Sequence, residues 1–126
     1  MPLMSETVHR VSVLCVSRFR ELALLRQRVL ELEGFEVIRP ETKAECMAAI
    51  ASARFDCLLI CHSISADSAR EVMDEFRRRN PRGCLIAILA SPWARGAYQV
   101  DVSISGTDGP DVLVETVRNC EQAHKA

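Results

Sequence analysis

The chain has 126 residues, of which 48% are hydrophobic and 26% charged, and its net charge is −1 at pH 7. These values predict one soluble domain over residues 1–126, with residues 1–8 as a loose leader. A charge so close to zero excludes a general electrostatic attraction to nucleic acid or to an anionic membrane. No apolar run reaches the roughly 18–20 residues that a membrane span needs.

Six cysteines are present, without the spacing of a metal site or a disulfide framework. The sequence has no CxxC pair and no His/Cys cluster, and its first residues do not resemble a signal peptide. Free cysteine behaves as a small buried hydrophobe, and reduced thiols are typical of the cytoplasm. We therefore expect six free thiols, no metal and no cofactor, in a cytoplasmic protein.

Apolar strands and amphipathic helices alternate in the first half of the chain. Residues 11–16 predict a buried strand, and Ser17 is a candidate N-cap for the helix that follows. The apolar face of that helix repeats at three and four residues, at Leu22, Leu25, Val29 and Leu32. Residues 35–39 predict a shorter strand, after which Thr42 and Glu45 form a capping-box pattern. The helix that they open should bury Cys46, Ala49, Ile50 and Ala53.

The second half continues the alternation. Residues 55–63 (FDCLLICHS) contain an unbroken apolar run, which is typical of a strand buried on both faces. Residues 66–79 predict a helix, residues 84–90 another buried strand and residues 100–104 an edge strand. Pro110 begins a closing helix. The inner faces expected for these two helices are Val72, Met73 and Phe76, and then Leu113, Val117 and Cys120.

This order of elements predicts a flavodoxin-like (βα)5 sandwich, doubly wound, with a five-stranded parallel sheet in the order 2-1-3-4-5. The segment between the fourth and fifth strands is short and interrupted by Gly96, so we expect a shortened fourth helix there. Chemistry in such sheets occurs at the carboxyl ends of the strands next to the switch point. Ser17, Arg18 and Phe19 should therefore lie beside Cys61, His62 and Ser63.

The run VSVLCVSRFRELALLRQRVLELEGFEVIRPETKAECMAAIASARFDCLLICHSI resembles the receiver domains of bacterial response regulators. The similarity includes E-G-F-E-V after the first helix and F-D-x-L-L-I in the third strand. It extends more loosely through LIAILAS to PDVLVETV, and so covers nearly the whole chain. The resemblance implies a signal-transduction module of a two-component system.

The resemblance also assigns the functional positions of a receiver to residues of this chain. A receiver is phosphorylated on an Asp five residues after the Asp that opens its third strand, and counting from Asp56 that position holds Cys61. The acidic pair that binds Mg²⁺ falls on Ser17 and Arg18. The Ser or Thr that ends the fourth strand is matched by Ser91.

The remaining family position, a lysine at the end of the fifth strand, falls on Ser105 or Gly106. Neither Ser17 nor Cys61 supplies the carboxylate that Mg²⁺ requires, and Arg18 would repel a dication. Without metal and lysine, no group would neutralise the charge on a transferring phosphoryl group. We therefore predict a degenerate, pseudo-receiver domain that binds no metal, is not phosphorylated and is not an enzyme.

Two functions remain open. The first is a stand-alone signalling module that acts by contact with another signalling protein or with a second copy of itself, and not with nucleic acid or membrane. The second is a thiol-based redox sensor or minor thiol enzyme that uses Cys61, since a neighbouring imidazole can activate a thiol. Cys61 and His62 are adjacent on a strand, however, and should point to opposite sides.

Two surface features could serve a partner. Trp93 and Tyr98 lie in the short segment after the fourth strand, where they either cover the sheet edge or form an aromatic anchor for another protein. Four arginines end the helix of residues 66–79 and follow it, where cations oppose the helix dipole. They predict a solvated helix end, with an acidic partner or nucleic acid as the alternative, although the slightly acidic chain disfavours a dedicated nucleic-acid binder: Arg77, Arg78, Arg79 and Arg82.

Overall fold

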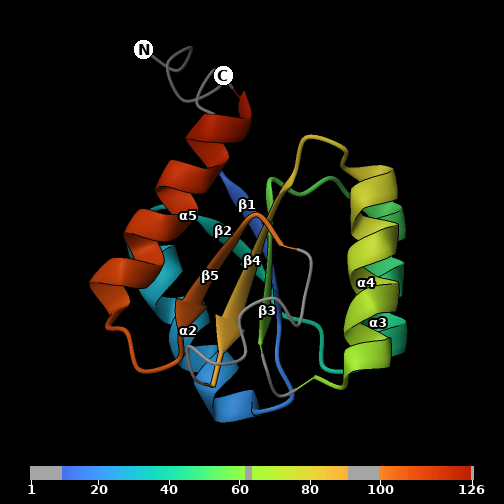
Figure 1. The fold of residues 1–126 in the computed structure, drawn as a ribbon, viewed down its shortest axis with the longest axis horizontal. Coiled ribbons are helices and arrows are strands. Elements are labelled where there is room, and N and C mark those ends of the chain that lie inside the picture. Colours follow the sequence, from blue (N-terminus) through green and yellow to red (C-terminus); the bar gives the residue numbers. More distant parts are fainter. Residues whose placement is uncertain (1–9, 62–63, 91–99, 126) are drawn as a thin grey trace.

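A five-stranded parallel sheet forms the centre of the structure (Figure 1). The structure is a computed structural model that describes residues 10–61, 64–90 and 100–125. The strands are β1 (Ser12–Val16), β2 (Glu36–Ile38), β3 (Cys57–Cys61), β4 (Cys84–Leu89) and β5 (Val102–Ser105). Their order in the sheet is β2-β1-β3-β4-β5. The predicted flavodoxin-like order 2-1-3-4-5 is therefore confirmed.

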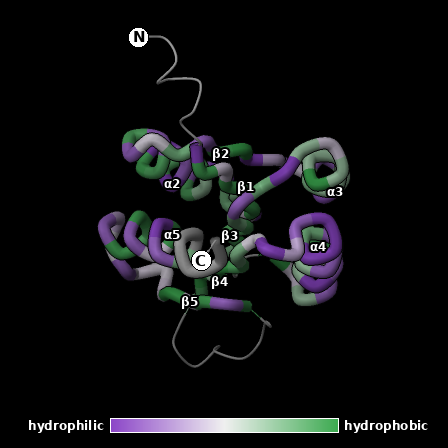
Figure 2. The backbone as a smooth tube through the Cα atoms, turned by 90° about the horizontal axis from the view of Figure 1, so that it is seen from above, coloured by the Kyte–Doolittle hydropathy of each residue, from purple (hydrophilic) through white to green (hydrophobic). Residues whose placement is uncertain are grey.

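Four helices within the described ranges cover the sheet: α2 (Arg20–Leu32), α3 (Lys43–Ser52), α4 (Ala66–Arg79) and α5 (Pro110–Lys125). Helices α2 and α5 lie on one face, and α3 and α4 lie on the other (Figure 2). None of these four helices is long and apolar enough to cross a membrane. The shortened fourth helix expected after β4 would fall in residues 91–99, outside the described part of the chain.

Successive residues of each central strand contribute to two separate cores, because neighbouring strand side chains point to opposite faces. In β3, Leu58 and Ile60 pack with α3 and α4, whereas Cys57 and Leu59 pack with α2 and α5. All residues of β3 and β4 are buried. The apolar run of residues 55–63 is thus the middle strand of the sheet, as its pattern predicts.

The face that α2 turns to the sheet differs from the prediction. Leu25 and Leu32 are 60% and 86% exposed, and the buried residues of the helix are Ala23, Arg26 and Leu30. Leu30 lies seven residues after Ala23, so these two form an apolar stripe with Arg26 between them. Arginine is typical of exposed positions, so the sequence pattern favours the face with the neighbouring leucines as the buried one.

The two expected helix starts had different outcomes. Ser17 is not an N-cap, because α2 begins at Arg20 and the Ser17 hydroxyl accepts a hydrogen bond from Phe19 N at 3.2 Å, inside the turn before the helix. Thr42 is the N-cap of α3 and accepts from Glu45 N at 3.0 Å, as predicted. The inner faces are confirmed for α4 and α5, whereas in α3 only part of the expected face is buried: Cys46 and Ile50, with Ala49 half-buried and Ala53 exposed.

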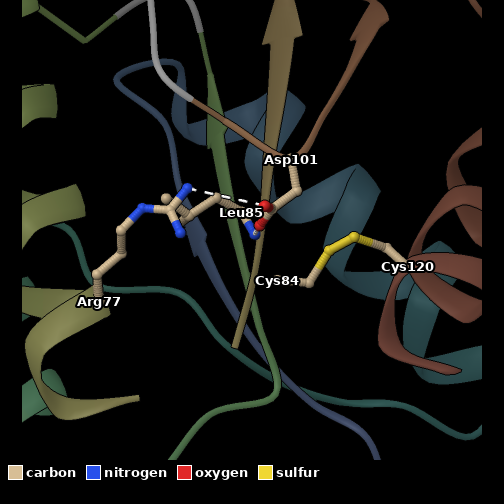
Figure 3. The surroundings of a disulfide bond; sticks show 5 residues. All are labelled: Arg77, Cys84, Leu85, Asp101 and Cys120. Atoms are coloured by element: carbon tan, nitrogen blue, oxygen red, sulfur yellow. Dashed lines mark hydrogen bonds and ion pairs between the residues drawn. A yellow bond between two sulfur atoms is a disulfide. The ribbon is translucent and has the colours of Figure 1, made fainter. Parts of the chain in front are cut away.

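Aspartate side chains tie the amino ends of the strands together. Asp56 accepts a hydrogen bond from Ser12 N at 2.8 Å, and Asp101 accepts one from Leu85 N at 2.8 Å. Asp101 also forms an ion pair with Arg77 of α4, 3.8 Å apart (Figure 3). β5 begins at Val102, two residues after the start at residue 100 that the sequence pattern predicts.

A disulfide joins α5 to the start of β4, which corrects the expectation of six free thiols. Its partners are Cys84 and Cys120, whose Cα atoms lie 6.1 Å apart, within the range found for disulfides (Figure 3). The two residues are 36 positions apart in sequence, so only the packing of α5 on the sheet brings them together. Four other cysteines are free and buried: Cys15, Cys46, Cys57 and Cys61.

We expect the disulfide to stabilise the fold by restricting the unfolded chain. Closure of a loop of 36 residues corresponds to about 3–4 kcal/mol in the chain-entropy model. A reducing agent should therefore lower the urea midpoint of unfolding, and Cys120→Ser without reductant should have the same midpoint as the reduced wild type. Cys46→Ser, which removes a free thiol, should keep the response to reductant. An unchanged midpoint on reduction would contradict this assignment.

Candidate functional site

The carboxyl ends of β1 and β3 meet at the switch point of the sheet. Strand β1 pairs with β2 on one side and with β3 on the other, and Val16 is in register with Ile60. The next residues, Ser17 and Cys61, therefore lie at the same edge, with Arg18 directly after Ser17. The predicted juxtaposition of the ends of these strands is present, except that His62 and Ser63 lie outside the described residues.

Cys61 contacts a residue that the sequence analysis did not single out. The side chain of Arg26 comes from α2, and its Nη1 donates a hydrogen bond to Cys61 Sγ at 3.4 Å. Arg26 is 7% exposed and Cys61 is 1% exposed. An arginine remains protonated even when it is buried, so a full positive charge lies beside Cys61, to which the receiver resemblance assigns the phosphorylated position.

The signal that could have identified Arg26 is its place in the helix. It lies between Ala23 and Leu30 on the stripe that faces the sheet, and long basic side chains on such a stripe are buried only when a polar atom inside accepts from them. Cys61 was already predicted to lie at that edge. The contact depends on which face α2 turns to the sheet. The more numerous leucines of the helix favour a different face from the one that is buried.

Cys15 of β1 belongs to the same cluster. The pKa of the Cys15 thiol is raised to about 12, mainly by burial; Arg26 and Arg39 lower it in part, and Cys61 adds to the rise. Arg39 itself is held by Gln27, at 3.1 Å, and by an ion pair with a glutamate of the next loop. Cys15 is therefore a neutral thiol at physiological pH, and not a nucleophile.

The raised pKa of Cys15 predicts a loss of stability at alkaline pH. Its ordinary pKa is 9.0 and its folded pKa is about 12. Between these values the unfolded chain binds fewer protons than the folded one, so the free energy of unfolding falls as pH rises. At pH 10 this thiol alone should contribute a loss of about 1 kcal/mol relative to pH 8.

Urea unfolding of wild type and Cys15→Ala at both pH values checks this prediction. The variant lacks the titrating group, so its loss between pH 8 and pH 10 should be smaller by about that amount. An equal loss in both proteins would mean that Cys15 ionises as readily in the folded state as in the unfolded one.

Ser17 and Arg18 line a cleft between the end of β1, the start of α3 and the first turns of α4. The cleft has a volume of about 290 Å³, and Glu41 and Lys43 contribute to its wall. The Glu41 carboxylate forms ion pairs with Arg20 and Arg39, at 3.8 and 3.6 Å. The carboxylate of this wall is therefore already engaged by two guanidinium groups.

The residues at the expected metal position do not fit Mg²⁺. This cation binds carboxylate, carbonyl and water oxygens, whereas Ser17, Arg18 and Cys61 supply a hydroxyl, a guanidinium and a thiol. Within residues 10–61, 64–90 and 100–125, no group of three His, Cys, Asp or Glu side chains could hold a metal ion. The donor set thus disagrees with the metal that the receiver resemblance implies.

One further predicted site residue, Ser105, falls in the described part of the chain. Ser105 ends β5, where its N–H donates to Asp108 at 2.9 Å and its hydroxyl lies 2.9 Å from the Thr107 hydroxyl. It therefore shapes the turn before α5. Three of the predicted positions lie outside the described residues: Ser91, Trp93 and Tyr98.

Three of the four arginines near the end of α4 form ion pairs within the chain. Arg78 and Arg79 both bind Glu75, at 2.6 and 3.1 Å, and hydrogen bonds from them lower the pKa of that carboxyl group. Arg77 pairs with Asp101. These contacts favour the interpretation of a solvated helix end over a site for an acidic partner.

The structure is similar to solved receiver domains over nearly its whole length. A CheY-like response regulator receiver domain protein from Methanospirillum hungatei JF-1 matches with a TM-score of 0.79 and 19% identity, over 93% of this chain and 98% of that one. A response regulator protein from Thermotoga maritima, in complex with Mg²⁺ and BeF, matches with a TM-score of 0.74 and 22% identity, over 87% and 98%. An adenylate cyclase from Rhodopirellula baltica matches with a TM-score of 0.76 and 16% identity, over 93% and 91%.

No protein-family model and no curated protein matches the sequence. The similarity to solved structures, at identities below 25%, therefore establishes the fold and not the activity. The chain has the CheY-like flavodoxin fold that response regulator receiver domains share.

Proposed function

We propose that this protein is a signal-transduction module with a receiver fold that works through protein contacts and is not switched by phosphorylation. The observation that carries the proposal is the buried contact between Arg26 and Cys61, 3.4 Å long, at the carboxyl end of β3. A thiol stands at the acceptor position, and a permanent cation stands beside it.

The chemistry of phosphoryl transfer supports this interpretation. Receiver phosphorylation requires a carboxylate to accept the phosphoryl group and a metal ion to neutralise the charge that develops on it. A guanidinium beside Cys61 repels a dication, and the positions of the acidic pair hold Ser17 and Arg18. We infer that the protein is not an enzyme, even though one protein of the same fold is an adenylate cyclase, because fold alone does not carry function.

The proposed partner is another signalling protein or a second copy of the chain. Two large apolar side chains at the start of α2 favour a protein partner, because Phe19 is 54% exposed and Leu25 is 60% exposed. The earlier candidates for this role, Trp93 and Tyr98, stay a prediction. The cytoplasmic location also stays a prediction. It is based on free thiols in a reducing compartment, and the Cys84–Cys120 disulfide weighs against such a compartment.

Incubation with acetyl phosphate and Mg²⁺, followed by intact-mass measurement, tests the lack of phosphorylation. We expect no gain of a phosphoryl group in the wild type. Cys61→Asp should also remain unmodified, because it restores the acceptor but leaves Arg18 and Arg26 in place. Mg²⁺-dependent phosphorylation of the wild type would overturn the proposal, and phosphorylation of Cys61→Asp would show that the acceptor alone had been lost.

A thiol-based function at Cys61 is the alternative, and its contact with Arg26 is the observation that favours it, since a nearby cation stabilises a thiolate. Burial opposes this effect, because Cys61 is 1% exposed. We expect alkylation of Cys61 at pH 7.5 to be at least about a hundredfold slower in the native protein than in urea, since labelling requires local opening and each tenfold corresponds to about 1.4 kcal/mol.

Peptide mass spectrometry after timed alkylation separates Cys61 from the other thiols. If Cys61 reacts rapidly in the native protein and Arg26→Met slows that reaction, the thiol function is favoured over the contact module. Arg28→Met, which removes an exposed arginine of the same helix, is the matched control.

A further inference from the structure

We propose that a groove between α2 and α5 binds a small amphipathic carboxylate, with the carboxylate on Arg26 and the hydrocarbon tail between the two helices. This ligand would serve as the input of the signalling module, and only that role rests on the function proposed above. The binding itself is a separate property.

The groove has mostly apolar walls. Its volume is about 210 Å³, and it lies between α2 and the turn and first residues of α5. The apolar side chains that line it are Leu22, Leu25, Val29, Ile88, Ile104 and Leu113. Leu25 is 60% exposed, so a tail lying against it would remove apolar surface from water. Leu22 and Leu25 belong to the face of α2 that the sequence pattern predicts to be buried.

The groove also contains a buried cation with few partners. Arg26 lines the groove, and the one hydrogen bond of its guanidinium to the described residues goes to the thiol of Cys61. A guanidinium has five N–H donors, and sulfur is a weak acceptor. No buried side-chain nitrogen or oxygen among the described residues lacks a partner, so a guanidinium nitrogen of Arg26 that forms no hydrogen bond is accessible to solvent, and Arg26 is one of the residues that line the groove. A carboxylate there could accept two of them in parallel.

The charge of the lining favours a monoanion. Asp108 also lines the groove, and its carboxylate accepts from Ser105 N at 2.9 Å in the turn before α5. The groove thus carries one positive and one negative side chain. A head group with a single negative charge gains from Arg26 with less repulsion from Asp108 than a phosphate dianion would experience.

The volume sets the length of the tail. At about 30 Å³ for a group the size of a water molecule, a space of 210 Å³ holds roughly seven such groups. Hexanoate, with eight non-hydrogen atoms, matches this space, whereas acetate leaves most of it empty. A ligand of this size should bind with a Kd on the order of 1 mM.

The arrangement inverts the charge of a receiver site. The receiver resemblance implies carboxylates that hold a cation, whereas here Cys61 contacts a fixed cation from α2. A site with that sign selects an anion.

Titration of the full chain with hexanoate, hexanol and acetate, followed by methyl NMR, tests the proposal. Hexanoate should shift the methyl signals of Leu22, Leu25, Ile104 and Leu113 in a saturable manner, and hexanol and acetate should each bind at least about tenfold more weakly, because each lacks one half of the ligand. Equal binding of hexanol and hexanoate, or hexanoate shifts confined to other residues, would overturn it.

Variants separate the contributions of charge and tail. Arg26→Met should weaken hexanoate at least about tenfold and leave hexanol unchanged, because only the charged hydrogen bonds are lost. Leu25→Asp, at an exposed position, should weaken both ligands, and the control Arg28→Met should weaken neither. Unchanged hexanoate binding by Arg26→Met would contradict the proposal. If Arg26→Met fails to fold, the wild-type comparison and Leu25→Asp still decide it.

These results are independent of the phosphorylation experiment. Hexanoate binding without any effect of Arg26→Met would refute the ligand site and leave the phosphorylation-free module intact. Conversely, phosphorylation of the wild type by acetyl phosphate would refute the module and leave the binding measurements unaffected.

Discussion

The carboxyl edge of the sheet depends on the placement of one buried charge. Arg26 is 7% exposed, and its guanidinium contacts Cys61 at 3.4 Å. Burial of a charge is unfavourable unless polar groups or solvent compensate it, and a thiol compensates it poorly. The helix that carries Arg26 is rotated so that Leu22 and Leu25 line the groove and Leu32 faces solvent. One interaction thus links the rotation of α2, the sign of the site and the shape of the groove beside it.

The sheet determines where that charge acts. Because β1 lies between β2 and β3, crossover connections leave the sheet in opposite directions at this point and open a space at its edge. Receiver domains share this architecture. In this chain, hydroxyl, thiol and guanidinium groups occupy the positions that the resemblance assigns to carboxylates. The architecture is common to both, whereas the electrostatics of the edge is opposite.

The fold could be predicted because each of its elements leaves a local signal. The unbroken apolar run at residues 55–63 indicates a central strand, and the capping pattern at Thr42 and Glu45 indicates the start of α3. The site was predictable only in part. The strand order alone is enough to place Cys61 and Ser17 at the same edge of the sheet. Its defining residue, Arg26, lies on an amphipathic helix whose two apolar stripes compete, and only tertiary packing selects between them. The Cys84–Cys120 disulfide likewise depends on contact between distant segments.

Titration with Mg²⁺, observed by amide NMR at residues 17, 18 and 61, tests the central claim most directly. A site in which a fixed cation has replaced the carboxylates should give no saturable shifts at these residues up to concentrations well above physiological ones. Saturable shifts there, lost in the presence of chelator, would contradict the account, because they would mean that the edge of the sheet still attracts a dication.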